Sequence, residues 1–461
     1  MSVDQQPRHD RLWTARRWPF VTSMLALMTF IAFESFAITT VLPVAMADLD
    51  GTRWYSLSYA ATLTTALVGM IVGGNWADRS GPRLPLAVGG TLFVVGIAMC
   101  GLAPNAAAFV LGRLLQGVGG GIDSVVLYVL IARHIRAELR PRMFGLLTTA
   151  WLLPSMIGPV LAGLLTELTN WRVVLGIVLA GAAASLAGLM VVTRDTAPRT
   201  RTPRMAIPLF GRPGVLAVVA AGLLLVLHLS GQHPTRQSVI AVPIALVALV
   251  VTASRILPPG TLRLRGAPQR LVALRAMLGA VVTASDVYLT FYLQGERGFP
   301  PATAGLVIAI GATGWAAGAW IQGRLGGGAD THRLLIRSAA PLVASGPACV
   351  LLYTLDLAHL VVVIGACVAM GIGMGIAYPR ISSATLSMAD ESEHGQYSSA
   401  LQAGENMAAA ALLAVSATLL STVAGTTGFA LAYGLLLTGG AIAILIASTQ
   451  PREVSVEASG A

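Results

Sequence analysis

The sequence contains no lysine and few charged residues of any kind. All 30 basic residues are arginine, and charged residues occupy only 11% of the 461 positions. A P-loop needs its lysine to bind nucleotide phosphates, and Schiff-base chemistry needs a lysine amine. Both are therefore excluded, and we expect no ATP to be bound by this chain as an energy source.

Cysteine is also scarce, with Cys100, Cys349 and Cys367 isolated in apolar runs that offer no CxxC spacing. This pattern argues against a disulfide and a metal site, so we expect no metal and no cofactor. The first apolar run lacks a small-residue cleavage site, and we expect it to remain as a helix.

Long apolar runs dominate the chain, whose mean hydropathy is +0.75. A run of about 18 or more apolar residues predicts a membrane-spanning helix. Twelve such runs lie near residues 20–42, 56–76, 84–103, 107–131, 143–166, 172–193, 271–294, 302–323, 338–355, 358–378, 397–421 and 428–448. The sequence thus predicts an all-α polytopic membrane protein.

Two shorter apolar runs, near 214–230 and 238–254, lie between these two sets of six. They are at the lower length limit for a span, and either both cross the membrane or neither does. We favour both crossing. The predicted divisions are an N-terminal bundle (1–193), a linker with two extra spans (194–270), a C-terminal bundle (271–449) and a tail (450–461).

The arginines predict the orientation. With a cytoplasmic N-terminus, 25 of them fall in the inner segments and four in the outer loops. This asymmetry indicates that both termini are cytoplasmic in the plasma (inner) membrane. Topology and anionic lipid account for the net charge of +10, so we expect no nucleic-acid partner.

The loop after the second span, GGNWADRSGPRLPL, combines an acid, arginines and glycines in a tight turn. A polar turn held by local ion pairs is one interpretation. The pattern also resembles the G-x-x-x-D-R-x-G-x-[RK] loop of the major facilitator superfamily. The matching residues are Gly74, Asp78, Arg79, Gly81 and Arg83. The resemblance implies that Asp78 contacts a helix end of the other half in the outward-open state.

A degraded form of this loop recurs at Gly323 to Asp330, which suggests duplicated halves, as in many transporters. The fifth span, PSMIGPVLAG, resembles the antiporter motif of exporters in the same superfamily. Gly158, Pro159 and Gly163 match that motif, whereas Pro154 and Ala162 differ. Plain helix packing is the alternative interpretation of these residues.

The fourth span places Arg113, Gln116, Gly120 and Asp123 on one helix face about 80° wide, which we expect to point inward. Arg113 and Asp123 are about 15 Å apart along the axis, too far to neutralise each other. Structural pairing with neighbouring helices is one interpretation. The R-x-x-Q-G spacing resembles the superfamily's fourth-span motif, whose arginine is implicated in proton transfer, and Asp123 has no counterpart there.

Glu34 is an isolated acid in the first span, FESFAITTVLP, nine residues before Pro43. This spacing resembles the 14-span drug:proton antiporters of the superfamily, as does the segment from Phe291 to Leu306. An ionised carboxylate inside the membrane is costly. A site that holds a proton when empty and releases it when a cation arrives exchanges the two. We expect Glu34 and Asp123 to face one cavity; the alternative is a neutral Glu34 that serves packing alone.

Two further embedded acids are secondary candidates, together with Gln116. Asp286 lies in the first core span of the second half and is a possible counterpart of Glu34. Glu405 lies nearer the cytoplasmic end, where it is a candidate gate residue or a solvated acid.

These features predict a major facilitator fold of two pseudo-symmetric six-helix bundles with two extra helices between them. The expected function is proton-coupled export of amphipathic, cationic compounds by a monomer whose partners are a small-molecule substrate, protons and the lipid bilayer. Export of a specific lipid or metabolite is the alternative. An intramembrane enzyme is disfavoured by the absence of HExxH, GxSxG and paired histidines, and a sensor by the absence of a sizeable soluble domain.

Overall fold

The computed structural model describes residues 14, 17–136, 139–194, 210–232, 236–325, 329–390, 393–423 and 425–449. Several predicted segments lie wholly or partly outside the described residues. They are the N-terminal segment before the first span (1–13) and most of the linker before the first extra helix (195–209). Three glycines of the degraded loop (326–328) and the tail (450–461) also lie outside the described residues.

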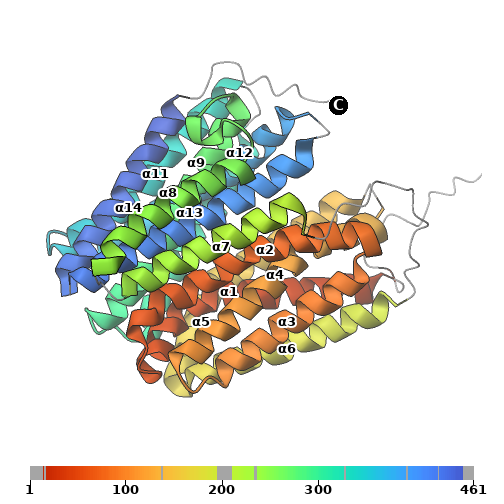
Figure 1. Cartoon of the computed structure of the whole chain (residues 1–461), viewed down its shortest axis with the longest axis horizontal. Coiled ribbons are helices and arrows are strands. Elements are labelled where there is room, and N and C mark those ends of the chain that lie inside the picture. The colour runs from red at the N-terminus through yellow and green to blue at the C-terminus, as the bar shows by residue number, and fades with distance from the viewer. Residues whose placement is uncertain are drawn as a thin grey trace, which may run out of the picture.

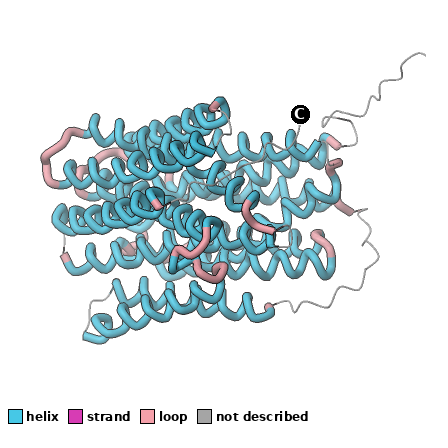
Figure 2. The backbone as a smooth tube through the Cα atoms, turned by 90° about the horizontal axis from the view of Figure 1, so that it is seen from above, coloured by secondary structure: helices cyan, strands magenta, loops and turns pink. Residues whose placement is uncertain are grey.

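The described residues form fourteen α-helices, two short 3-10 turns and no strand (Figure 2), which confirms the predicted all-helical class. The helices are α1 Trp18–Asp48, α2 Tyr55–Ser80, α3 Arg83–Gly101, α4 Ala106–His134, α5 Arg140–Leu168, α6 Trp171–Val192, α7 Gly211–Gln232, α8 Arg236–Ile256, α9 Ala267–Gly295, α10 Pro301–Arg324, α11 Ala329–Thr354, α12 Leu360–Ser387, α13 His394–Thr422 and α14 Gly425–Ser448.

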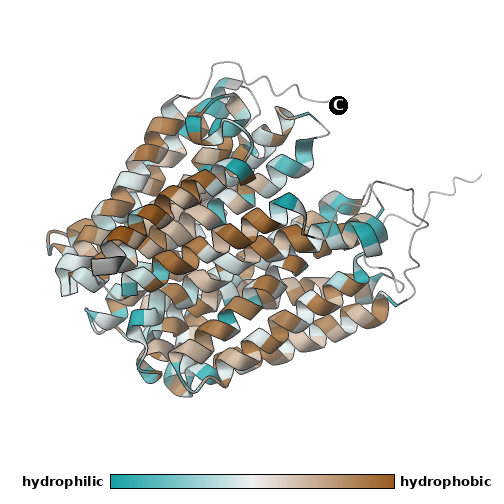
Figure 3. Cartoon of the chain, in the orientation of Figure 1, coloured by the Kyte–Doolittle hydropathy of each residue, from teal (hydrophilic) through white to brown (hydrophobic). Residues whose placement is uncertain are grey.

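Thirteen of the described helices are long and apolar enough to span a membrane. The exception is α8, whose apolar part is the shorter stretch Ile240–Ile256. Brown, apolar residues dominate the helix surfaces in Figure 3, and polar residues gather at the helix ends. This distribution fits a chain that lies in a bilayer with its loops in water.

Most of the helices extend beyond the predicted apolar runs at one end or both. The first run was expected to end near Pro43, but α1 continues through this proline to Asp48. Proline is tolerated there because neighbouring helices pack around the interrupted backbone. At the start of α4, the Asn105 side chain accepts a hydrogen bond from the Ala108 backbone N–H at 2.9 Å.

The helices form two bundles (Figure 1), and the helix contacts assign six helices to each. In the first bundle α1 packs against α5 and α6, α4 against α2 and α3, and α3 against α6. In the second bundle α9 packs against α13 and α14, α12 against α10 and α11, and α11 against α14. The two sets of contacts correspond helix for helix, so the bundles are pseudo-symmetric as predicted.

The extra helices α7 and α8 lie across the boundary between the bundles (Figure 1). Helix α7 contacts α2 of the first bundle and α13 of the second, and α8 packs mainly on α7. Neither helix enters the contacts between α1, α4 and α9, where the candidate site lies.

We call the side of the molecule at which α1 begins and α14 ends the terminal side, and the opposite side the distal side. The bundles diverge toward the terminal side in Figure 1 and approach each other toward the distal side. Interbundle contacts connect α5 with α10, α2 with α13, and α1 with both α9 and α10.

Candidate functional site

Glu34 and Arg113 form a buried ion pair between α1 and α4. Arg113 Nη1 donates to Glu34 Oε1, and the two side chains are only 3% and 5% exposed. An isolated charge at this depth is costly, whereas a hydrogen-bonded pair of opposite charges is tolerated. The acid that was isolated in the sequence therefore has its partner 79 positions away.

The Arg113 guanidinium is held by three further hydrogen bonds. It donates to the Ser58 carbonyl at 3.0 Å, to Gln116 Oε1 at 2.9 Å and to the Thr62 hydroxyl at 3.2 Å. Four of its five N–H groups are thus used, which fixes the plane of the guanidinium. Any change in the charge of Glu34 must therefore change the hydrogen bonds of this network.

Close packing of α2 and α4 brings Ser58 and Thr62 to Arg113. Gly117 and Gly121 of α4 lie directly against the α2 backbone at Thr62 and Ala66. A Cβ at either glycine would collide with that backbone, so a larger residue would push the helices apart. The glycine-rich sequence after Arg113 therefore positions the arginine.

Asp123 lies elsewhere in the first bundle. It is fully buried, and its Oδ1 lies against Gly89 of α3, on the side of α4 that packs against α3. Neither carboxylate oxygen has a hydrogen-bond partner among the described residues. The expected shared cavity with Glu34 is not formed in this arrangement, because Glu34 pairs with Arg113 and Asp123 contacts α3.

Asp286 approaches the same region from the second bundle. Tyr59 of α2 lies close enough to interact electrostatically with Asp286, Arg113 and Glu34. Asp286 is partly exposed, and within the described residues its carboxylate makes no hydrogen bond or ion pair. Acids from α1 and α9 therefore both lie within electrostatic range of one tyrosine.

Hydrogen bonds join the bundles on the distal side of this site. Tyr55 donates to the Val287 carbonyl at 2.7 Å, Tyr288 to the Ser56 hydroxyl at 3.2 Å, and Ser56 to the Leu413 carbonyl at 3.1 Å. Tyr55 and Phe291 also stack at 4.2 Å. These six residues form what we call the distal contact.

His228 of α7 extends the distal contact. Its Nδ1 lies 3.5 Å from the Ser56 hydroxyl, and the side chain is 1% exposed. The structure buries this histidine against α2. Helix α7 is therefore part of the contact between the bundles.

The antiporter motif lies at a second interbundle contact, between α5 and α10. Gly163 lies against the backbone of Ala302, and the Pro159 carbonyl lies against Gly305. Gly158 faces the side chains of Phe33 and Phe36 on α1. The motif residues thus allow α5 to pack closely against helices of both bundles.

A second buried ion pair lies toward the terminal side of the second bundle. Arg275 donates to Glu405 Oε2 at 3.2 Å and to the Ser382 hydroxyl at 2.5 Å, and its guanidinium lies 3.7 Å from the Tyr378 ring centre. Arg275 was counted with the loop arginines, but it is an interior residue of α9 that is 5% exposed. Glu405 is therefore paired.

The loop after the second span, which was expected to contact the other half through Asp78, lies at the terminal end of α2. Asp78 and Arg79 are exposed, and Gly81 ends the helix at a φ of +84°. Arg83 donates to the Arg194 carbonyl at 3.5 Å. Gly74 lies against the Val125 side chain of α4. In the part of the chain that the structure describes, Asp78 makes no hydrogen bond or ion pair with the second bundle.

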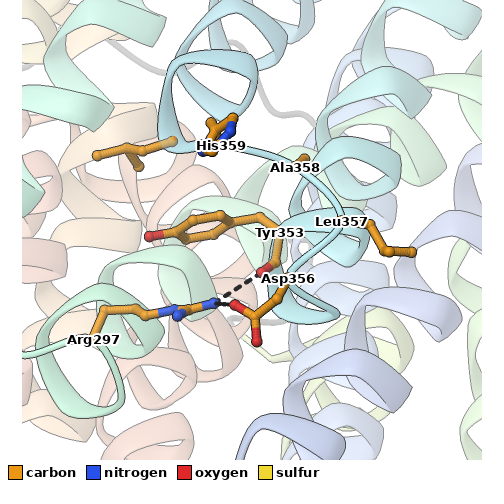
Figure 4. Close-up of a pocket in the computed structure, with 7 residues that line it drawn as sticks. Arg297, Tyr353, Asp356, Leu357, Ala358 and His359 are labelled. Carbon is orange, nitrogen blue, oxygen red and sulfur yellow. Dashed lines mark hydrogen bonds and ion pairs between the residues drawn. The ribbon is translucent and has the colours of Figure 1, made fainter.

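A separate pocket of about 400 Å³ opens at the distal end of the second bundle (Figure 4). Arg297 donates to Asp356 Oδ1 at 2.5 Å and to the Tyr353 carbonyl at 3.0 Å, and His359 completes the lining in this view. The Asp356 hydrogen bond raises the pKa of Arg297 above its ordinary value. This satisfied arginine leaves the pocket without a free charge, so it stays outside the candidate site.

Sequence reasoning missed four residues of the site: Tyr59, Ser58, Thr62 and Arg275. Tyrosine, serine and threonine are common in spans, and only the fold brings these to Arg113. Arg275 carried a usable signal, because it is an arginine within the expected span 271–294.

Comparisons with known proteins agree with this architecture. The sequence profile of the Major Facilitator Superfamily matches residues 24–414. A protein of Mycobacterium tuberculosis named as a probable multidrug-efflux transporter is 25% identical over 92% of this chain and 93% of its own length. An MFS-type transporter of Claviceps purpurea is 25% identical over 96% of this chain and 80% of its own length.

Solved structures show the same fold at low sequence identity. A POT family transporter in complex with 5-aminolevulinic acid has a TM-score of 0.69 at 14% identity, covering 93% of this chain and 96% of its own. A peptide transporter POT in complex with sulfate has a TM-score of 0.67 at 18% identity, covering 94% and 95%. The profile match extends over most of the chain, and the chain therefore belongs to the Major Facilitator Superfamily.

Proposed function

We propose that this protein is a proton-coupled antiporter that exports amphipathic, cationic compounds from the cytoplasm. The observation that carries this proposal is the buried Glu34–Arg113 pair between α1 and α4 of the first bundle, on the terminal side of the distal contact. The relatives named as efflux transporters support the direction of transport.

The Glu34–Arg113 pair provides a proton switch. An ionised Glu34 is stabilised by the guanidinium, and protonation removes the charge that Arg113 neutralises. The arginine is then a buried cation without a counter-charge, and its network with Ser58, Thr62 and Gln116 must rearrange. Protonation thereby changes the free energy of the arrangement that holds α1, α2 and α4 together.

The arginine distribution favours cytoplasmic termini, and so a terminal side that faces the cytoplasm. The bundles are joined on the distal side and diverge on the terminal side, which corresponds to an inward-facing state. Rocking of the bundles about the site would open the distal contact to the outside. A proton that enters down a potential of 100 mV supplies about 2.3 kcal/mol for the cycle.

Ethidium efflux from cells that lack their own pumps tests this function. We expect wild type to export the dye, a protonophore to abolish export, and Glu34→Gln at matched expression to lose it. Arg53→Gln, at an exposed arginine in the loop before α2, serves as the matched control and should export normally. Normal export by Glu34→Gln would contradict the role of Glu34, and a failure of wild type to export any cationic dye would favour a specific lipid or metabolite.

A further inference from the structure

We propose that Asp286, and not Glu34, supplies the negative charge that binds the cationic substrate. This inference rests on the proposed function and assigns proton coupling and substrate binding to two different acids. Glu34 and Arg113 form the proton switch, and Asp286 holds the cation near Tyr59.

The charges around the site favour this division. Glu34 is neutralised by Arg113 at direct hydrogen-bonding distance. Asp286 has no such partner, and it interacts electrostatically with Tyr59, Cys367 and Tyr433, which carry no formal charge at neutral pH. When Asp286 is ionised, the site therefore carries one unbalanced negative charge, and an arriving cation removes the cost of that charge.

The pseudo-symmetry of the bundles explains why Asp286 is unpaired. Helices α1 and α4 of the first bundle correspond to α9 and α12 of the second. Arg113 and Cys367 each lie seven residues after the first residue of their helix, on α4 and α12. The second bundle thus has an acid on α9 and, at the position on α12 that corresponds to Arg113, a cysteine.

The face of α9 that carries Asp286 also carries Arg275. The two residues are eleven positions apart. This spacing places them within about 20° of one face and about 16 Å apart along the axis. Arg275 is occupied by Glu405, and at that separation it cannot pair with Asp286. Substrate that enters from the terminal side meets a neutralised pair first and the free carboxylate at greater depth.

Asp286 is also placed to report occupancy to the distal contact. Its neighbours Ser285 and Val287 accept hydrogen bonds from Tyr433 at 2.9 Å and from Tyr55 at 2.7 Å, and Tyr288 contacts Ser56. A cation bound at Asp286 therefore lies within one helical turn of the groups that join the bundles. Because of this position, neutralisation of the Asp286 carboxylate is coupled to opening of the distal contact.

Binding of tetraphenylphosphonium to the purified full-length chain in lipid nanodiscs tests the assignment. We expect Asp286→Asn to lower affinity by about tenfold or more and Asp286→Glu, which keeps the charge, to bind within about threefold of wild type. Glu34→Gln should still bind at pH 7.5. Glu296→Gln, an exposed acid at the distal end of the same helix, is the matched control and should bind as wild type.

The outcomes separate this inference from the function on which it rests. If wild type and Asp286→Asn bind the cation equally, Asp286 is not its counter-charge, while proton-coupled export through Glu34 stands. If wild type binds no cation, both the inference and the cationic substrate class are overturned. Both Asp286 variants must elute as monodisperse species, which shows that they are folded. If Asp286→Glu also loses binding, a negative charge at this position is not sufficient and the inference fails.

Discussion

The ionisable residues of the interior fall into two kinds, those with a partner and those without one. Glu34 and Glu405 each pair with an arginine of another helix in their bundle. Asp123 and Asp286 have no hydrogen-bond partner in the described part of the chain, but Asp123 is sealed against α3 whereas Asp286 is partly exposed. Exposure thus separates an acid that can meet a substrate from one that cannot.

Breaking the buried pair on one side should destabilise the protein. Arg113→Gln leaves Glu34 without a counter-charge, and removal of one partner of a buried pair typically costs about 3–5 kcal/mol. We expect a marked fall in the melting temperature in detergent. The double variant Glu34→Gln/Arg113→Gln removes both charges, so it should recover most of the melting temperature while remaining inactive in efflux.

Arg172→Gln provides the control for that comparison. Arg172 pairs with Asp48 at 2.7 Å, but the side chains are 37% and 47% exposed. Exposed pairs contribute about 1 kcal/mol or less, so the melting temperature should change little. Equal falls in melting temperature for Arg113→Gln and Arg172→Gln would show that the buried pair stabilises the protein no more than the exposed pair does.

At the scale of helices, the contact between α5 and α10 decides how tightly the bundles close on the distal side. Glu167 at the end of α5 accepts a hydrogen bond from the backbone N–H of Ala302 at 2.6 Å. Gly163 and Gly305 let the two backbones approach. The antiporter motif is therefore explained by a contact across the bundles in the state described.

Enlarging these glycines should open the distal side. In Gly163→Val or Gly305→Val the side chain would collide with backbone of the facing helix, which disfavours the joined arrangement. With Gln294→Cys as a reporter, we expect faster reaction with a membrane-impermeant maleimide from outside. The variants should also transport more slowly, because the inward-facing state is disfavoured.

Gly145→Val lies on the same helix and serves as the control, because nothing lies within 4 Å of a Cβ built there. Its reporter should react as in the parent protein. Unchanged reactivity in Gly163→Val would mean that the α5–α10 contact does not control access from the distal side.

At the scale of the molecule, the two bundles share one pattern of helix contacts but carry different chemistry. The first bundle holds the Glu34–Arg113 pair, and the second holds Asp286 without an ion-pair partner among the described residues. Helix α7 contacts both bundles at α2 and α13. The proposed rocking of the bundles would therefore change the surface of α7 that one bundle contacts.

A crosslink across the distal side should stop the cycle. Gln294 of α9 donates to the Thr40 carbonyl of α1 at 3.0 Å. In a background with Cys100, Cys349 and Cys367 replaced by alanine, a short thiol crosslinker between Thr40→Cys and Gln294→Cys should abolish efflux. A reducible crosslinker should allow recovery after reduction. Either single cysteine treated alike is the control, and full efflux with complete crosslinking would contradict alternating access.

The sequence by itself determined the properties that depend on hydropathy and local spacing. Apolar run length fixed the helices to within a few residues at most ends, because spanning a bilayer needs a set length. Motif spacing indicated the superfamily, and the cost of charge inside a membrane singled out Glu34, Arg113, Asp123, Asp286 and Glu405. None of these inferences requires knowledge of which helices touch.

Only the tertiary structure decided which charges meet. Glu34 and Arg113 are 79 positions apart, and Arg275 and Glu405 are 130 apart. Periodicity gives the face on which a residue lies but not the helix that packs against that face. Asp123 shows the consequence: it shares a helix face with Arg113, yet its carboxylate contacts α3. The packing of two six-helix bundles, and not the spacing along the chain, leaves Asp286 as the unpaired acid of the site.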